Sequence, residues 1–225
     1  QAAIVSFDVS IRPGQRYIQL PYSKVPMGSK YPTFSFNYTK GISGVLGSDV
    51  DFDKWQLTVK DDRNLKLAGT LRYKLGVGGF INNKQVEIQD YQHFNGNRTI
   101  DASEYVNSFQ LAYYYANSTT EKFYSFAHLE HHFNGLLTNK IPLFRKLNWN
   151  LVAGSNAFFV NAKNNYVEAL VGLENIFKVF RVDFVAGYLN GIKGLTGFRV
   201  GFGGALGSGI KANVGTHGDG SSLNI

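Results

Sequence analysis

The chain has 225 residues, which is enough for one large domain with a buried core or for a membrane barrel of modest size. Its 23 Lys and Arg exceed its 16 Asp and Glu and give a net charge of +7, yet only 17% of the residues are charged, against roughly 25% in an average soluble domain. The 5 prolines and the 15% of aromatic residues exclude the disordered and proline-rich classes. The absence of cysteine excludes disulfides, thiolate metal sites and cysteine nucleophiles, and no apolar run is long enough for a transmembrane helix.

Alternation of apolar and polar residues recurs along the whole chain and predicts an almost entirely β structure. In the first strand, for example, Val5, Phe7 and Val9 alternate with Ser6 and Asp8. The strands predicted in this way span residues 5–12, 34–39, 55–60, 65–75, 105–115, 123–133, 149–160, 166–174, 179–189 and 198–206.

Four segments lack the alternation and predict connections of different kinds: a long loop at 13–32, a turn at 61–64, a long exposed loop at 82–103, and a linker or short interfacial helix at 136–148. The strands at 105–115 and 123–133 are expected to pair directly as a hairpin, because a polar turn separates them.

About ten strands of roughly 9–11 residues match the length needed to cross an outer membrane at a tilt. The predicted fold class is therefore an all-β, antiparallel transmembrane β-barrel, or part of a larger one. A soluble barrel has the same alternation, but three features favour lipid on the apolar face. Charged residues such as Lys66 and Arg72 occur in mid-strand on the other face, aromatic residues gather near strand ends, and no amphipathic helix could cap a sandwich. The barrel is expected over residues 1–206, followed by a polar Gly/Ser-rich tail at 207–225.

Several long strings of residues carry a resemblance to a known family. They are YPTFSFNYTKGISGVLGSDVDFDKW, LGVGGFINNKQVEIQDYQHFNGNRT, STTEKFYSFAHLEHHFNGLLTNKIPLFRKLNW and YVEALVGLENIFKVFRVDF. The strings resemble a family of Bacteroidota outer-membrane proteins of unknown function, over most of the chain. Longer members of that family have a carboxypeptidase-regulatory-like β-domain near the N-terminus and then a membrane barrel, and this chain is similar to the C-terminal part of the barrel. The closing strand FRVGFGG also resembles, more distantly, the last strands of the barrel-insertase and two-partner-secretion superfamily.

The resemblance implies that the chain is a processed or partial piece of a longer protein, or a shorter relative. A partial barrel would leave unpaired backbone groups along its first and last strands, at a cost of several kcal/mol per group in hydrocarbon. We therefore expect the edge strands to pair with other barrel segments or with protein subunits.

His128, Glu130 and His132 are two residues apart in sequence and therefore share one face of a strand, which is expected to line the barrel interior. Two imidazoles at this spacing could bind Zn²⁺ if a neighbouring strand supplied a third ligand. The alternative is a hydrated polar row in which neutral histidines bond to Tyr and Asn side chains. Since no other paired His or Asp motif supports a metal, we predict the polar row, with no metal and no cofactor.

A second group of charged residues is predicted on the inner faces of the last three strands. Opposite charges on adjacent strands fix the register and keep an interior hydrated, so a structural network in the barrel lumen is favoured over a substrate pathway. Two of its carboxylates, six residues apart on one strand, are separated by about 20 Å, which is too far for glycosidase chemistry. The members are Glu168, Glu174, Arg181, Asp183 and Arg199.

The motifs of common enzyme classes are missing. No nucleophile elbow, phosphate-binding loop or dinucleotide motif occurs in its required context, so no catalytic residue is predicted. Lys and Arg are scattered rather than clustered with aromatic residues, which argues against nucleic acid and favours contacts with outer-membrane lipid and lipopolysaccharide.

The predicted function is a non-catalytic structural, transport or envelope-assembly role in the bacterial outer membrane. The alternative is a soluble β-barrel or sandwich that binds a sugar or a lipid. That protein would enclose a pocket lined by Phe34, Trp55 and Leu71, with Lys66 and Arg72 facing water.

Overall fold

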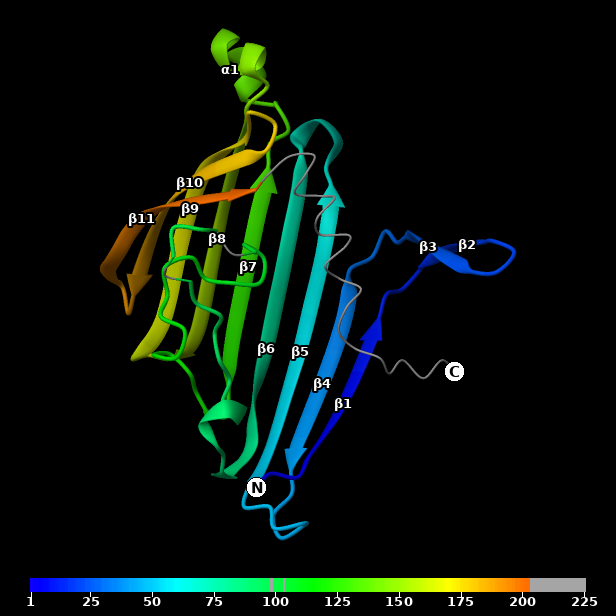
Figure 1. Ribbon diagram of the computed structural model, residues 1–225, viewed down its shortest axis with the longest axis vertical. Coiled ribbons are helices and arrows are strands. Elements are labelled where there is room, and N and C mark those ends of the chain that lie inside the picture. Colours follow the sequence, from blue (N-terminus) through cyan, green and yellow to red (C-terminus); the bar gives the residue numbers. More distant parts are fainter. Residues whose placement is uncertain (98, 103, 203–225) are drawn as a thin grey trace.

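The computed structural model describes residues 1–97, 99–102 and 104–202, and these residues form an all-β protein dominated by one curved sheet (Figure 1). Within this part of the chain, nine antiparallel strands follow the order β1-β4-β5-β6-β7-β8-β9-β10-β11, and β2 and β3 form a separate hairpin. The strands are β1 (Ile4–Ile11), β2 (Arg16–Gln19), β3 (Lys24–Gly28), β4 (Thr33–Gly41), β5 (Asp51–Asn64), β6 (Thr70–Gln85), β7 (Tyr124–His132), β8 (Asn150–Asn161), β9 (Asn164–Ile176), β10 (Phe180–Leu189) and β11 (Ile192–Phe202).

Helical structure is confined to short pieces between strands. The α-helix α1 (Pro142–Leu147) lies in the connection between β7 and β8, as the interruption at 136–148 predicted, and begins with proline at its first position. The 3₁₀ helices are η1 (Lys66–Ala68), η2 (Ile88–Asp90) and η3 (Thr138–Lys140). No helix among the described residues is long and apolar enough to cross a membrane.

Tight turns join the last strands into long hairpins. Between β10 and β11 the turn is Asn190-Gly191, and both residues have positive φ, at 53° and 75°. A two-residue turn of this kind matches the right-handed twist of its flanking strands, which is why Asn-Gly is favoured there. The connection between β8 and β9 is equally short.

Several strands lie where the alternation predicts them. The expected strands at 5–12, 34–39, 55–60, 149–160, 166–174 and 179–189 correspond to β1, β4, β5, β8, β9 and β10. The last predicted strand, 198–206, begins earlier, at the start of β11. Residues 203–206 and the predicted tail at 207–225 lie outside the described residues.

Two predicted connections are wrong. The turn expected at 61–64 is instead the end of β5, and the chain reverses at Leu65–Gly69, where Leu67 is 89% exposed. Leu65 and Leu67 continue the alternating pattern but cannot extend β6, because Gly69 adopts φ 99° and turns the chain. The long loop expected at 13–32 contains the β2–β3 hairpin, whose strands are too short to show a clear period.

The prediction for residues 105–115 is also wrong. They do not form a strand and do not pair with β7, whose neighbours are β6 and β8. They belong instead to a segment between β6 and β7, residues 86–123, which folds back over one face of the sheet (Figure 1). We call it the covering segment. It includes most of the loop expected at 82–103, which is therefore packed against the sheet rather than fully exposed, with Phe94 only 3% exposed.

The sheet is open over the described residues. Strand β1 pairs with β4 on one side, and its other edge has no strand neighbour in the described part of the chain. Strand β11 pairs with β10, and its other edge is bonded at Val200 to the backbone of Ile100 and Ala102 in the covering segment. Closure into a barrel remains a prediction.

Candidate functional site

The two faces of the nine-stranded sheet differ sharply in chemistry. The inner face, on which the covering segment lies, carries polar and charged side chains on nearly every strand, and many of them are buried. The outer face carries large apolar side chains that are exposed. The outer-face residues include Phe7, Phe36, Leu57, Leu75, Leu129, Phe159, Val171 and Phe184.

The structure places His128, Glu130 and His132 side by side on the inner face of β7. The Nδ1 atom of His128 lies 3.0 Å from Oδ1 of Asn156. His132 lies between two carboxylates, with Nδ1 2.9 Å from Glu174 Oε2 and Nε2 3.3 Å from Glu130 Oε2. Among the described residues, no three His, Asp or Glu side chains are grouped so that they could hold a metal ion. The row is thus linked by hydrogen bonds and ion pairs to neighbouring strands.

Glu130 is also the centre of a cluster of charges that spans several strands. Its carboxylate contacts the Arg181 guanidinium of β10 and lies 3.3 Å from Nη1 of Arg72 on β6. The Nε atom of Arg181 is 2.8 Å from Oδ2 of Asp183. Tyr105 of the covering segment donates its hydroxyl to Asp183, and the Arg181 guanidinium lies 3.9 Å from the centre of the Tyr105 ring. Burial and the Asp183 carboxylate raise the pKa of Tyr105, so its hydroxyl remains a donor.

Glu168 has no exposed surface and binds the covering segment directly. Its carboxylate accepts hydrogen bonds from the backbone N–H groups of Gln110, at 2.7 Å, and Leu111, at 3.1 Å. Asn156 Nδ2 at 2.7 Å and the Tyr166 hydroxyl at 2.8 Å supply two further donors. Four donors satisfy a buried carboxylate that would otherwise be strongly unfavourable.

The five charged residues predicted as one network therefore have two structural roles, an ion-pair cluster on the sheet and contacts that hold the covering segment. Arg181 and Asp183 form an ion pair, and Glu174 joins their cluster through His132 and Glu130. In contrast, Arg199 donates its Nε–H to the Gln110 carbonyl at 2.8 Å, so Arg199 and Glu168 hold the same short stretch of the covering segment.

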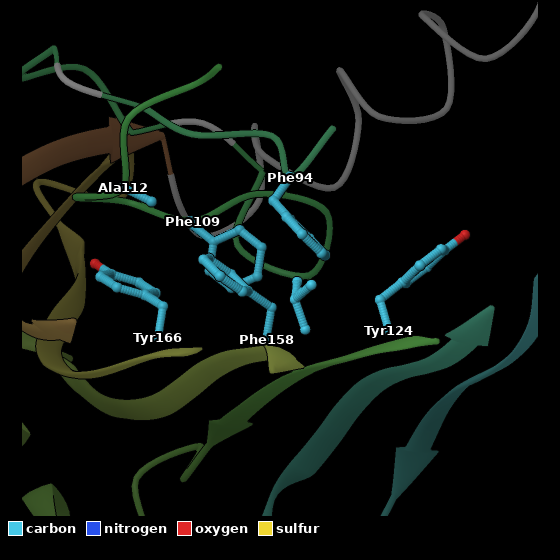
Figure 2. Close-up of a cluster of buried hydrophobic side chains, with 7 residues drawn as sticks. Phe94, Phe109, Ala112, Tyr124, Phe158 and Tyr166 are labelled. Atoms are coloured by element: carbon cyan, nitrogen blue, oxygen red, sulfur yellow. The ribbon is translucent and has the colours of Figure 1, made fainter. Parts of the chain in front are cut away.

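Aromatic rings attach the covering segment to the inner face beside these charges (Figure 2). Phe94 and Phe109 come from the segment, and Phe158 and Tyr166 rise from β8 and β9. The Phe94 ring stacks on Phe158 with 4.3 Å between centroids, and Phe109 meets Phe158 edge-on at 5.2 Å. Burial of one such ring is worth about 1.5–3 kcal/mol, which is the magnitude of a hydrogen bond to a charged group, so the rings and the polar contacts both contribute to the attachment.

Comparison with known protein families identifies the class of domain. Residues 1–173 match the C-terminal domain of a family of unknown function, DUF5686. The chain belongs to this family. No match was found among curated proteins. The sequence resemblance to a family of unknown function is confirmed at this level. The DUF5686 match includes the covering segment and all of β7, whereas Arg181, Asp183 and Arg199 lie beyond it.

Sequence reasoning missed the residues that this DUF5686 domain contributes from the covering segment. The alternation of residues predicts a strand at Tyr105, Gln110 and Leu111, and the polar composition around Phe94 predicts an exposed loop. The sequence holds no clear signal that Phe94 is buried, because other aromatic residues of this chain are exposed, Tyr22 at 101% and Phe177 at 82%.

The inner face of the DUF5686 domain is arranged to hold a segment of its own chain. The carboxylates of Glu130, Glu168 and Asp183 are all at most 2% exposed, and each accepts hydrogen bonds from protein donors. The backbone N–H groups of residues 110 and 111, which have no strand to pair with, are satisfied by one of these carboxylates. This geometry attaches the covering segment to the inner face of the sheet and restricts its motion.

Proposed function

We propose that this DUF5686 domain is part of an integral β-barrel protein of the bacterial outer membrane, with a non-catalytic structural, transport or envelope-assembly role. The observation that carries the proposal is the reversed distribution of side chains. Charged residues are buried on the inner face, while large apolar residues are exposed on the outer face.

The outer face exposes more apolar side chains than is usual for a surface in contact with water. Leu129, Phe159 and Val171 lie on three successive strands and are 41%, 46% and 47% exposed. Soluble proteins seldom expose contiguous apolar patches of more than a few hundred Å², and such patches mark surfaces that contact protein or membrane. Because the exposed residues continue over strands from β1 to β11, a bilayer fits them better than a local docking partner would.

The strands are long enough to cross a bilayer. A transmembrane strand needs about 9–11 residues at a tilt, and β7, β10 and β11 have 9, 10 and 11 residues. In hydrocarbon, the open edge of β1 would be strongly unfavourable. The proposal therefore requires that β1 pair with another barrel segment or with a protein subunit.

The covering segment has a defined place in this proposal. It would lie in the barrel interior against β7, β8 and β9, where it narrows the space available to a solute. The wider family context, with a Bacteroidota envelope and an N-terminal regulatory-like β-domain in longer members, is part of the same proposal.

The soluble alternative has less support. It requires Phe34, Trp55 and Leu71 to line an enclosed pocket, and Lys66 and Arg72 to face water. Lys66 lies in η1 and is exposed, as this alternative requires. Phe34 is 41% exposed on the outer face, whereas the Arg72 side chain is 21% exposed on the inner face and paired with Glu130.

Extraction of membranes from cells that produce the full-length protein tests the proposal. We expect the protein to resist alkaline carbonate and urea, to dissolve only in detergent, and to migrate faster on a gel when the sample is not boiled. Release by carbonate as a species that stays monomeric without detergent would contradict the proposal.

A further inference from the structure

The connections between strands lie at two ends of the sheet, and their charges differ. Because neighbouring strands are antiparallel, alternate connections share an end. One end, which we call the α1 end, carries the β2–β3 hairpin, η1, α1 and the turn between β9 and β10 (Figure 1). Its connections are residues 12–32, 65–69, 133–149 and 177–179.

Every charged residue in these four connections is Lys or Arg. They contain nine basic residues and no Asp or Glu, and all nine are exposed. The connections that leave the sheet at the opposite end are residues 42–50, 162–163, 190–191 and the covering segment, which starts and finishes there but lies over the inner face; together they contain three basic and six acidic residues. The connections at the two ends therefore carry net charges of +9 and −3.

In the described ion pairs, carboxylates at the ends of neighbouring strands offset one of these nine charges. Asp61 pairs with Arg12 at 3.6 Å, and Asp62 pairs with Arg72 of β6 at 3.0 Å. Among the nine basic residues of the α1 end, Arg12 has an acidic partner in the described ion pairs. An exposed surface with this excess of positive charge attracts polyanions.

Exposed apolar side chains lie among these cations. Tyr22, Leu67 and Phe177 each stand at the tip of a different connection and are 101%, 89% and 82% exposed. A polyphosphate or an acidic polysaccharide offers no apolar surface to these tips, and the bases of a nucleic acid would stack on the two aromatic tips but not on Leu67. The interface of a bilayer offers both phosphate for the cations and acyl chains for the tips.

We propose that the α1 end binds the phosphate-bearing headgroups of an anionic lipid leaflet. The basic residues contact phosphates, and the exposed apolar tips enter the boundary between headgroups and acyl chains. This inference rests on the proposed function and adds an orientation to it, since the α1 end then lies in the more anionic leaflet.

The absence of cysteine from the chain allows a direct test. Two exposed serines serve as label sites, Ser23→Cys at the α1 end and Ser43→Cys at the opposite end. The full chain with a donor fluorophore at either site is inserted into nanodiscs of phosphatidylcholine that contain a minor fraction of acyl-labelled phosphatidylglycerol as acceptor. Energy transfer then reports the local concentration of the anionic lipid.

We expect transfer from the Ser23 site to exceed the value for random mixing by about threefold or more, and transfer from the Ser43 site to match it. Acyl-labelled phosphatidylcholine should give the random value at both sites. The triple variant Arg145→Glu, Lys146→Glu and Lys178→Glu should abolish the excess, while the control variant Lys122→Glu with Lys163→Glu, at the opposite end, should retain it.

Equal transfer from the two sites, or an excess that survives the triple variant, would overturn the inference while leaving the proposed function intact. Loss of the excess on addition of inorganic phosphate, at an ionic strength matched with chloride, would also overturn it, because the surface would then bind free phosphate. Failure of the chain to enter nanodiscs would instead contradict the proposed function.

Discussion

The attachment of the covering segment predicts a specific response to Glu168→Gln. The substitution keeps the size of the side chain but replaces one carboxylate oxygen with an NH₂ group. The two oxygens of Glu168 each accept two hydrogen bonds, one of them from the backbone N–H of Gln110 or of Leu111. Whichever oxygen is replaced, a buried backbone donor then faces another donor.

Each buried donor left without an acceptor costs about 1–3 kcal/mol, and the Tyr166 hydroxyl can rotate to accept in compensation. We therefore expect the closed state of the covering segment to lose about 2–4 kcal/mol. Because 1.4 kcal/mol corresponds to a factor of ten, this is roughly a 30- to 1,000-fold increase in local opening. The aromatic rings and the charge cluster should keep the rest of the sheet folded.

Hydrogen exchange of the detergent-solubilised protein, read by mass spectrometry, measures this opening. Peptides that cover residues 105–112 should exchange much faster in Glu168→Gln, while peptides from β4 should be unchanged. Glu87→Gln, an exposed position on the same segment, is the matched control and should behave as the parent protein. Unchanged protection at 105–112, or an equal loss in β4, would refute the role given to Glu168.

Three further substitutions give separate predictions. Phe109→Ala removes a ring that is 1% exposed; it should cost about 3–5 kcal/mol and make the covering segment a target for limited proteolysis, and continued resistance would contradict the packing. Val171→Lys places a charge in mid-strand on the outer face and should make the free energy of membrane insertion less favourable by about 2–4 kcal/mol, which would reduce the recovery of carbonate-resistant protein. Leu46→Lys, in an exposed turn, is the control and should insert normally. Gly78→Ala puts a methyl group against the Tyr124 hydroxyl. The substitution should lower the free energy of unfolding by about 1–3 kcal/mol and so lower the midpoint of thermal unfolding. An unchanged midpoint would contradict the close contact between β6 and β7 at this position.

Local pattern was enough to predict most of the sheet. The alternation in β9, where Val167 and Val171 oppose Glu168, assigns both the strand and its two faces, because side chains of a strand alternate strictly. The Asn190-Gly191 turn is equally local. Such features depend on a few neighbouring residues and need no knowledge of the rest of the chain.

The covering segment could not be predicted in the same way. Residues 105–115 alternate like a strand, but the partners that decide their structure are Glu168 and Arg199, some 60 to 90 residues away in sequence. Since no local signal distinguishes an isolated apolar residue that packs on a sheet from one within a strand, the sequence pattern favoured the wrong element. The same limit applies to the charged residues, whose positions on one face were predictable but whose partners were not.

The proposed function requires that the outer face contact lipid, and site-directed spin labelling along β9 measures this contact. Nitroxides at each position from 165 to 173, in protein reconstituted into bilayers, report access to oxygen, which dissolves in lipid, and to a polar nickel complex, which does not. We expect access to oxygen to rise at 167, 169 and 171 and to fall at the positions between them, with little access to nickel at the maxima. High nickel access at 167, 169 and 171 would show that water covers this face and would contradict the claim.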